Sequence, residues 1–296
     1  MKLPEAFTSR MHNYFEEKGR LSEEADFFAS YEKEPVHGIR WNRLKISEDS
    51  YERYMKDMDL PAKKVTWCDG GFYAPNVSLG KDPYYHAGAY YIQEPSAMLP
   101  ASVLGTKPGE YVLDMCAAPG GKTFTIAEHM KDKGTIYAFD LHENRVKLIK
   151  DGAKRLGLKC IKARTNDGKE YSTDMPKADR VLCDVPCSGL GVIRRKPEIK
   201  YKDPADFERL PEIQYKILDN SASYVKRNGI LVYSTCTLSR AENDEVVDKF
   251  LQFHPEYVSC KLGEFFGYDK NKTRVTITPG VFNSDGFFIA KFRRIR

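Results

Sequence analysis

The sequence has no long hydrophobic run, although hydrophobic residues make up 41% of its 296 positions. Its apolar stretches are far shorter than the roughly 20 residues of a membrane-spanning helix, which excludes such a helix. Residues 1–20 carry many charges and lack the apolar core of a secretory signal. We therefore expect a cytoplasmic protein whose thiols stay reduced.

Cysteine occurs seven times and never as a C-x-x-C pair. An odd number of widely spaced cysteines gives no disulfide framework and none of the usual zinc-ligand spacings, so we expect no metal site. Four of them, Cys68, Cys160, Cys183 and Cys260, are expected to be small hydrophobic residues of the core. The other three lie in motifs that point to chemistry.

Two phosphate-binding patterns are incomplete in this chain. The dinucleotide pattern G-x-G-x-x-G is absent, and the P-loop pattern that ends at Lys122-Thr123 would need glycine where Cys116 stands. What remains is a predicted strand ending at Asp114, a turn of small residues, and Asp140 at the end of the next strand. An acid at that position can accept the hydroxyls of a ribose. The pattern therefore favours S-adenosylmethionine (AdoMet) over a nucleoside triphosphate.

Two cysteines follow later predicted strands, Cys187 in the segment DVPCSG (184–189) and Cys236 in YSTCT (233–237). The carboxyl ends of parallel strands meet at one edge of a sheet, so we expect both thiols to share a crevice with the cofactor turn. This combination indicates chemistry on a pyrimidine ring, because a thiolate that adds to carbon 6 of cytosine makes carbon 5 nucleophilic. One thiol is needed for the addition, and the chemistry alone does not choose between the two.

Positive charge is unevenly distributed along the chain. The net charge is +5, and the excess lies in residues 109–296, with a basic run at 194–202 (RRKPEIKYK) and another at 291–296. Basic groups beside a site suit a substrate that carries phosphate. The alternative is that the run at 194–202 is only a solvated face.

The hydrophobic pattern divides the chain into two expected domains, 1–108 and 109–296. The first is expected to be a small α+β domain with a linker helix at 95–104, and the second alternates strands with amphipathic helices. Such alternation predicts a Rossmann-like α/β fold with a mostly parallel sheet covered by helices on both faces, closed by an antiparallel hairpin. Expected strands lie at 36–41, 65–67, 71–73, 111–115, 135–139, 159–163, 180–184, 229–234, 274–277 and 286–292, and expected helices at 4–31 (broken near Gly19), 50–58, 95–104, 122–131, 143–156 and 207–227.

Several of these motifs together resemble one known family. In order along the chain they are 116–122 (CAAPGGK), 184–189 (DVPCSG), 234–237 (STCT) and 285–290 (DGFFIA). They are similar to the motifs of the Nol/Nop/Sun family of RNA cytosine-carbon-5 methyltransferases, and residues 84–96 (YYHAGAYYIQEPS) resemble its RsmF-type members, which act on 16S ribosomal RNA. The resemblance covers nearly the whole chain and implies a class I AdoMet-dependent methyltransferase fold with seven strands.

The resemblance also implies roles for individual residues. It makes Cys236 the nucleophile that attacks carbon 6 and Cys187 the residue that assists release of the covalent adduct. Asp184 is expected to hydrogen-bond the cytosine, and Lys122 to lower the pKa of a thiol by its charge. The cofactor residues that the resemblance implies are Cys116, Ala117, Ala118, Pro119, Gly120, Gly121, Lys122, Asp140, Arg145, Asp167 and Asp184.

The expected partner is RNA, and the expected oligomeric state is a monomer. Cytosine has to leave its stack to reach a thiol in a crevice, so the RNA should be single-stranded, looped or flipped out. Tyr84, Tyr85, Tyr90, Tyr91 and the run at 194–202 are candidates to hold it, with core packing as the alternative for the tyrosines. RsmF-type proteins usually continue into a C-terminal RNA-binding extension, whereas the sequence given ends at Arg296. Either it is truncated, or RNA capture rests on residues 1–108 and the basic surface. Residues 279–284 also differ from the histidine-containing stretch of many relatives. Transfer RNA therefore stays open as the substrate beside ribosomal RNA.

Two other interpretations compete with this one. Methyltransferases that act on amino groups have an Asn/Asp-Pro-Pro-aromatic turn where this chain has DVPC, and their chemistry needs no thiol. An inactive RNA-binding or ribosome-assembly factor would not need the intact Cys236 and Lys122.

Overall fold

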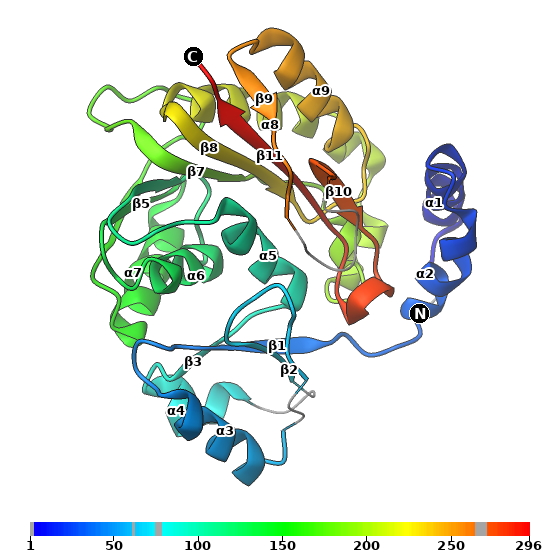
Figure 1. The fold of residues 1–296 in the computed structure, drawn as a ribbon. Coiled ribbons are helices and arrows are strands. Elements are labelled where there is room, and N and C mark those ends of the chain that lie inside the picture. Colours follow the sequence, from blue (N-terminus) through cyan, green and yellow to red (C-terminus); the bar gives the residue numbers. More distant parts are fainter. Residues whose placement is uncertain (1–2, 61–62, 75–78, 264–270) are drawn as a thin grey trace.

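The computed structural model describes residues 3–60, 63–74, 79–263 and 271–296. Two sheets organise the chain (Figure 1). The elements of the first part are α1 (Glu5–Glu17), α2 (Glu24–Ser30), β1 (His37–Trp41), α3 (Glu48–Asp57), β2 (Gly71–Ala74), α4 (Pro83–His86), β3 (Tyr90–Ile92) and α5 (Pro95–Leu104). Those of the second part are β4 (Tyr111–Asp114), α6 (Gly121–His129), β5 (Thr135–Asp140), α7 (Glu143–Leu156), β6 (Ile161–Thr165), β7 (Ala178–Asp184), α8 (Leu210–Ser223), β8 (Val225–Thr235), α9 (Asp244–Phe253), β9 (Tyr257–Ser259), β10 (Arg274–Ile277) and β11 (Phe287–Arg294).

The larger sheet has the strand order β10-β11-β8-β7-β4-β5-β6, and the short strand β9 pairs with β11. Its central strands are parallel, whereas β10 and β11 run antiparallel to their neighbours. Alternate residues of each strand face opposite sides of a sheet. Val112 accordingly packs with α5, α6 and α7, and Leu113 packs with α8 and α9. The expected Rossmann-like fold with an antiparallel C-terminal end is confirmed.

The smaller sheet, of order β2-β1-β3, is antiparallel throughout. Its core is aromatic, with Trp41 stacked on Tyr51 of α3 and in edge contact with Tyr90. The first two helices pack elsewhere: Phe15 and Phe27 share a hydrophobic cluster with Leu190 and Leu238, which lie in the loops after β7 and β8. The N-terminal helices thus brace the loops that carry the cysteine motifs.

Some expected elements differ from the observed ones. Residues 66 and 67 form a turn rather than a strand, and among the described residues of this segment the ladder contact is a single bridge between Lys64 and Phe72. The helix expected at 207–227 ends at Ser223, since the backbone of Val225 already belongs to β8 and pairs with Ala178. Helix α9 and strand β9 were not expected. Among the described residues, no helix is both long and apolar enough to cross a bilayer.

Four cysteines were expected to be buried core residues, and the structure shows how far each is buried. Cys68, Cys160 and Cys183 are buried free thiols, as predicted. Cys260 is only half-buried, so that part of the prediction is wrong.

Candidate active site

The predicted cofactor turn connects β4 to the first turn of α6. Gly120 caps this helix with φ +110°, and a Cβ there would lie 2.3 Å from the ring of Phe124. Both the left-handed conformation and the close ring therefore require glycine at this position. The first residues of α6, Gly121 and Lys122, line the cavity beside this turn, at the helix end where the dipole favours negative charge.

A cavity of about 210 Å³ lies at this turn. It brings together the predicted residues Cys116, Ala117, Ala118, Pro119, Gly121, Lys122 and Asp184. Its wall also contains Tyr91, Gln93, Glu94 and Asp114, which were not among the predicted cofactor residues. Asp114 had been noted at a strand end, whereas nothing in the local sequence connects β3 to this turn.

Asp114 is the most informative residue of the cavity wall. Its carboxylate is 1% exposed, and Oδ2 accepts a hydrogen bond from Thr123 Oγ1 at 2.6 Å. Its Oδ1 atom has no hydrogen-bond partner among the described residues. Burial raises the pKa of Asp114 to about 7. A buried acceptor without a partner is costly, and a cationic amino group such as that of AdoMet would satisfy it.

The other predicted cofactor residues lie beside the cavity rather than in its wall. Asp140 is buried at the end of β5, and Arg145 NH2 is 3.5 Å from its Oδ2 and donates to Ala118 O at 2.9 Å. Arg145 thus ties the predicted ribose acid to the turn. Asp167 accepts from the backbone N–H of Lys169 at 3.0 Å and also pairs with the ammonium group of Lys169.

The two predicted catalytic thiols are adjacent. Cys187 Sγ and Cys236 Sγ are 3.3 Å apart. Cys187 follows β7 and Cys236 follows β8, and these parallel strands are in register through Asp184 and Ser234, whose side chains share a hydrogen bond of 2.6 Å. The strand pairing therefore brings together two motifs that are 49 residues apart in the sequence.

Charged groups beside the thiols make the pair asymmetric. The hydrogen bond with Cys187 lowers the pKa of Cys236, and Lys122 and Lys196 lower it further against the effects of burial and Asp184. The same hydrogen bond, together with burial, raises the pKa of Cys187 well above its usual range. The surroundings of Cys236 therefore favour the thiolate form, and those of Cys187 favour the thiol.

Lys122 connects the cofactor cavity to the thiols. Its Nζ atom is 2.7 Å from Asp184 Oδ2. Burial opposes its charge, but the ion pair with Asp184 outweighs burial and raises the pKa of Lys122. The lysine is thus a fixed cation beside Cys236.

The tyrosines of residues 84–91 lie in different environments. Tyr90 is completely buried and hydrogen-bonds to Asp82, so it is a core residue. Tyr85 lies under the guanidinium of Arg155, whereas Tyr84 is 50% exposed. RNA contact by Tyr90 is therefore excluded by its burial.

The basic run at 194–202 is likewise divided. Arg194 is buried, and it pairs with Asp285 at 3.3 Å. Arg195 pairs with the other carboxylate oxygen at 2.7 Å. These two arginines serve the structure, while Lys196 and Lys202 are exposed. Burial removes Arg194 from the candidates for RNA contact, and the role of the other basic residues of the run stays a prediction.

The fold and the turn define a class I AdoMet-dependent methyltransferase. A family model described as 16S rRNA methyltransferase RsmB/F matches residues 101–293, and one described as the N-terminal domain of 16S rRNA methyltransferase RsmF matches residues 3–95. The chain belongs to the RsmB/F methyltransferase family.

Individual relatives are similar over most of the chain. Probable ribosomal RNA small subunit methyltransferase B of Bacillus subtilis (strain 168) is 48% identical over 88% of this chain and 60% of that protein. Ribosomal RNA small subunit methyltransferase F of Serratia proteamaculans (strain 568) is 33% identical over 91% of this chain and 59% of that protein. The chain thus spans about 60% of the length of these curated relatives.

Solved structures show the same architecture. A methyltransferase homolog protein from Pyrococcus horikoshii is 31% identical, with a TM-score of 0.79 over 93% of this chain and 91% of that one. NSun6 from Pyrococcus horikoshii has a TM-score of 0.86 over 99% of this chain and 98% of that one, at 23% identity, and so shares the fold.

Proposed function

We propose that this protein uses AdoMet to form 5-methylcytosine in RNA, with small-subunit ribosomal RNA as its substrate. The observation that carries the proposal is the thiol pair 3.3 Å apart, with Lys122 and Asp184 between it and the cofactor cavity. Relatives named for methylation of small-subunit ribosomal RNA support the choice of substrate. An enzyme that methylates amino groups would have no use for such a pair.

The residues around the cavity suit AdoMet. The carboxylate of Asp114 would receive the amino group, the turn at 116–122 would carry the methionine portion, and Asp140 with Arg145 would hold the ribose. We keep Asp167 as the proposed contact of the adenine, although its carboxylate is occupied by Lys169. Bound there, AdoMet supplies an electrophilic methyl group.

Carbon 5 of cytosine is a poor nucleophile until another nucleophile adds to carbon 6 of the ring. The thiolate of Cys236 adds to carbon 6, and the displaced electron pair makes carbon 5 nucleophilic. After carbon 5 is methylated, a base removes its proton, the carbon 5–carbon 6 double bond reforms, and the Cys236 thiolate leaves. We assign to Cys187 the assistance of this release, and to Asp184 the hydrogen bond that orients the cytosine.

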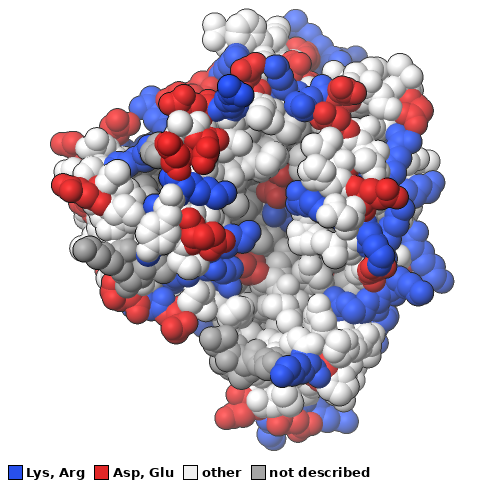
Figure 2. All heavy atoms as spheres, turned by 180° about the vertical axis from the view of Figure 1, so that it is seen from behind, with Lys and Arg blue, Asp and Glu red and all other residues white. Residues whose placement is uncertain are grey.

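Substrate capture is proposed to involve residues 1–108 together with basic groups of the catalytic part, 109–296. Figure 2 shows a face that is hollowed near its middle, with Lys and Arg on both sides of the hollow. Such an arrangement suits the phosphates of an RNA strand whose base is turned inward.

Two variants test the roles of the thiols. The protein is incubated with AdoMet and small-subunit RNA from a strain that lacks the gene, and 5-methylcytosine is mapped by mass spectrometry. Cys236→Ala should form neither product nor adduct, whereas Cys187→Ala should accumulate a covalent RNA adduct on denaturing gels. The reverse pattern would exchange the two roles. Methylation of transfer RNA in place of ribosomal RNA would correct the substrate, and methylation of neither would refute the proposal.

A further inference from the structure

A buried acid that belongs to neither cysteine motif joins the two turns. Glu242 lies just before α9 and is 2% exposed. Its Oε2 atom accepts from the backbone N–H of Ser188 at 2.8 Å, and its Oε1 atom from Ser188 Oγ at 2.5 Å and from Thr237 Oγ1 at 3.5 Å. Ser188 and Thr237 directly follow the two cysteines. One carboxylate therefore clamps the residue after each thiol.

Further contacts fix this carboxylate in place. Gln214 of α8 donates through Nε2 to Glu242 Oε2 and to Pro186 O, both at 2.9 Å. Tyr233 of β8 donates from its hydroxyl to the backbone carbonyl of Glu242 at 2.6 Å. Ser188 Oγ and Thr237 Oγ1 are themselves 2.7 Å apart. The network thus joins α8, β8 and both cysteine turns.

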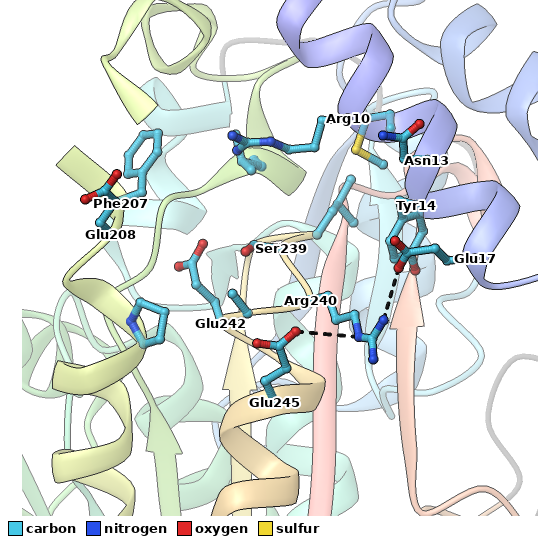
Figure 3. Close-up of a pocket in the computed structure, with 15 residues that line it drawn as sticks. Arg10, Asn13, Tyr14, Glu17, Phe207, Glu208, Ser239, Arg240, Glu242 and Glu245 are labelled. Carbon is cyan, nitrogen blue, oxygen red and sulfur yellow. Dashed lines mark hydrogen bonds and ion pairs between the residues drawn. The ribbon is translucent and has the colours of Figure 1, made fainter. Parts of the chain in front are cut away.

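The charge of Glu242 is not neutralised by a neighbouring cation. All the donors named above are neutral, and within the described ranges no ion pair involves this residue. The nearby Arg240 pairs instead with Glu17 and Glu245. Figure 3 shows Glu242 among the residues that line a cavity of about 740 Å³, together with residues of α1 and of the segment 238–245.

We propose that Glu242 is a positioning residue that sets the relative placement of the two thiols and keeps the shared proton on Cys187. This inference rests on the proposed function, because it explains how Cys236 rather than Cys187 becomes the attacking thiolate. The negative charge of Glu242 acts on Cys187, whereas the charges of Lys122 and Lys196 act on Cys236.

Among the described residues, Cys236 and Glu242 are the titratable groups that act most strongly on Cys187, and the hydroxyl of Tyr233 is in turn affected by Cys187 and Glu242. Cys236 is faced in addition by Asp184 and by the two lysines. Glu242 acts on Cys187 and also contacts both turns, so its removal should reduce the asymmetry between the two thiols.

The test measures thiol reactivity in the whole chain and needs no RNA. The Cys236→Ser background removes the neighbouring thiol, and alkylation of Cys187 by iodoacetamide is followed on its own peptide by mass spectrometry over a pH range that extends above 10. Adding Glu242→Gln should move the midpoint for Cys187 to lower pH, because the nearby negative charge is gone. Adding Glu245→Gln, an equal change of charge three residues away on an exposed side chain, should leave the midpoint in place. An unchanged midpoint in a folded Glu242→Gln protein would overturn the proposal.

A second variant separates placement from charge and also serves if Glu242→Gln does not fold. Glu242→Asp keeps the charge but shortens the clamp, so the midpoint for Cys187 should stay high. Its kcat should fall about 10- to 100-fold through misplaced thiols, with the KM for AdoMet unchanged. A folded Glu242→Asp enzyme with the parent kcat would refute the placement role. If the protein methylated no RNA at all, the alkylation profiles would still decide the charge role, so failure of the proposed function is distinguishable.

Discussion

Two buried carboxylates at the same edge of the large sheet, Asp114 and Glu242, have opposite surroundings. Asp114 has one oxygen bonded to Thr123 and the other without a partner on the wall of the cofactor cavity. Both oxygens of Glu242 are engaged, by Ser188, Thr237 and Gln214. Because an unsatisfied buried acceptor costs free energy, the first arrangement is that of a binding site and the second that of a scaffold.

The difference predicts opposite effects when each acid is neutralised. An acid kept unpaired for a ligand should be dispensable for folding and needed for binding. An acid that holds two turns together should be needed for folding and for thiol placement, and irrelevant to the cofactor. Neutral amides of the same size separate these cases.

The largest effect is expected for Asp114→Asn on AdoMet affinity. The amide oxygen would still accept the hydrogen bond from Thr123, but the negative charge that faces the cavity would be lost. We expect AdoMet to bind about 100-fold more weakly, the equivalent of about 3 kcal/mol for a charge-assisted hydrogen bond. Titration calorimetry measures this. The unfolding temperature should not fall, since the ionised acid opposes folding at pH 8. Equal affinity would show that Asp114 does not contact the cofactor.

The opposite pattern, a loss of stability without a loss of affinity, is expected for Glu242→Gln. The amide turns one acceptor into a donor that faces existing donors, so at least one buried hydrogen bond is lost. We expect the free energy of unfolding to fall by about 2 kcal/mol, while AdoMet affinity is unchanged. Urea denaturation gives the first quantity and calorimetry the second. A variant as stable as the parent protein would remove the contrast between the two acids.

The sequence predicted the parts of this comparison that are local. The hydrophobic pattern placed the strands that end at Asp114 and Asp184, and the motifs located the turn and both thiols. The sequence did not reveal Glu242, because its partner Ser188 is 54 residues away and the two meet only through the pairing of β7 with β8.

The other residues whose place the sequence did not predict have the same explanation. Tyr91 and Gln93 reach the cofactor cavity from the small sheet, and no local pattern encodes that contact. Arg194 belongs to a basic run that is typical of a solvated face, yet tertiary structure buries it against Asp285. Short-range pattern therefore predicted the elements and the reactive groups, while contacts between distant segments decided which polar residues serve the site.

The pH dependence of AdoMet affinity sharpens the assignment to Asp114. The pKa of this acid is about 7 in the free protein, so it is protonated at lower pH and ionised at higher pH. A cationic partner requires the ionised form, and affinity should therefore fall about tenfold between pH 8 and pH 6. The pKa of Glu94, in the same cavity wall, is also raised to about 7, by burial and by Asp285. The dependence should vanish in Asp114→Asn. If it persisted there and vanished in Glu94→Gln, Glu94 would be the responsible acid.

The smallest effect is expected for Arg145→Ala, which tests how far the site extends beyond the cavity wall. The guanidinium is 48% exposed and lies 3.5 Å from Asp140, so solvent screens most of their attraction. Its hydrogen bond to Ala118 O holds the turn only from outside. We expect AdoMet affinity to fall about two- to fivefold, the range of an exposed ion pair, with kcat unchanged. Arg145→Lys should recover part of the loss through its charge. A loss of AdoMet affinity as large as that of Asp114→Asn would mean that the cofactor contacts Arg145 directly. Arg145 would then belong to the binding site itself and not only to the residues that support the turn.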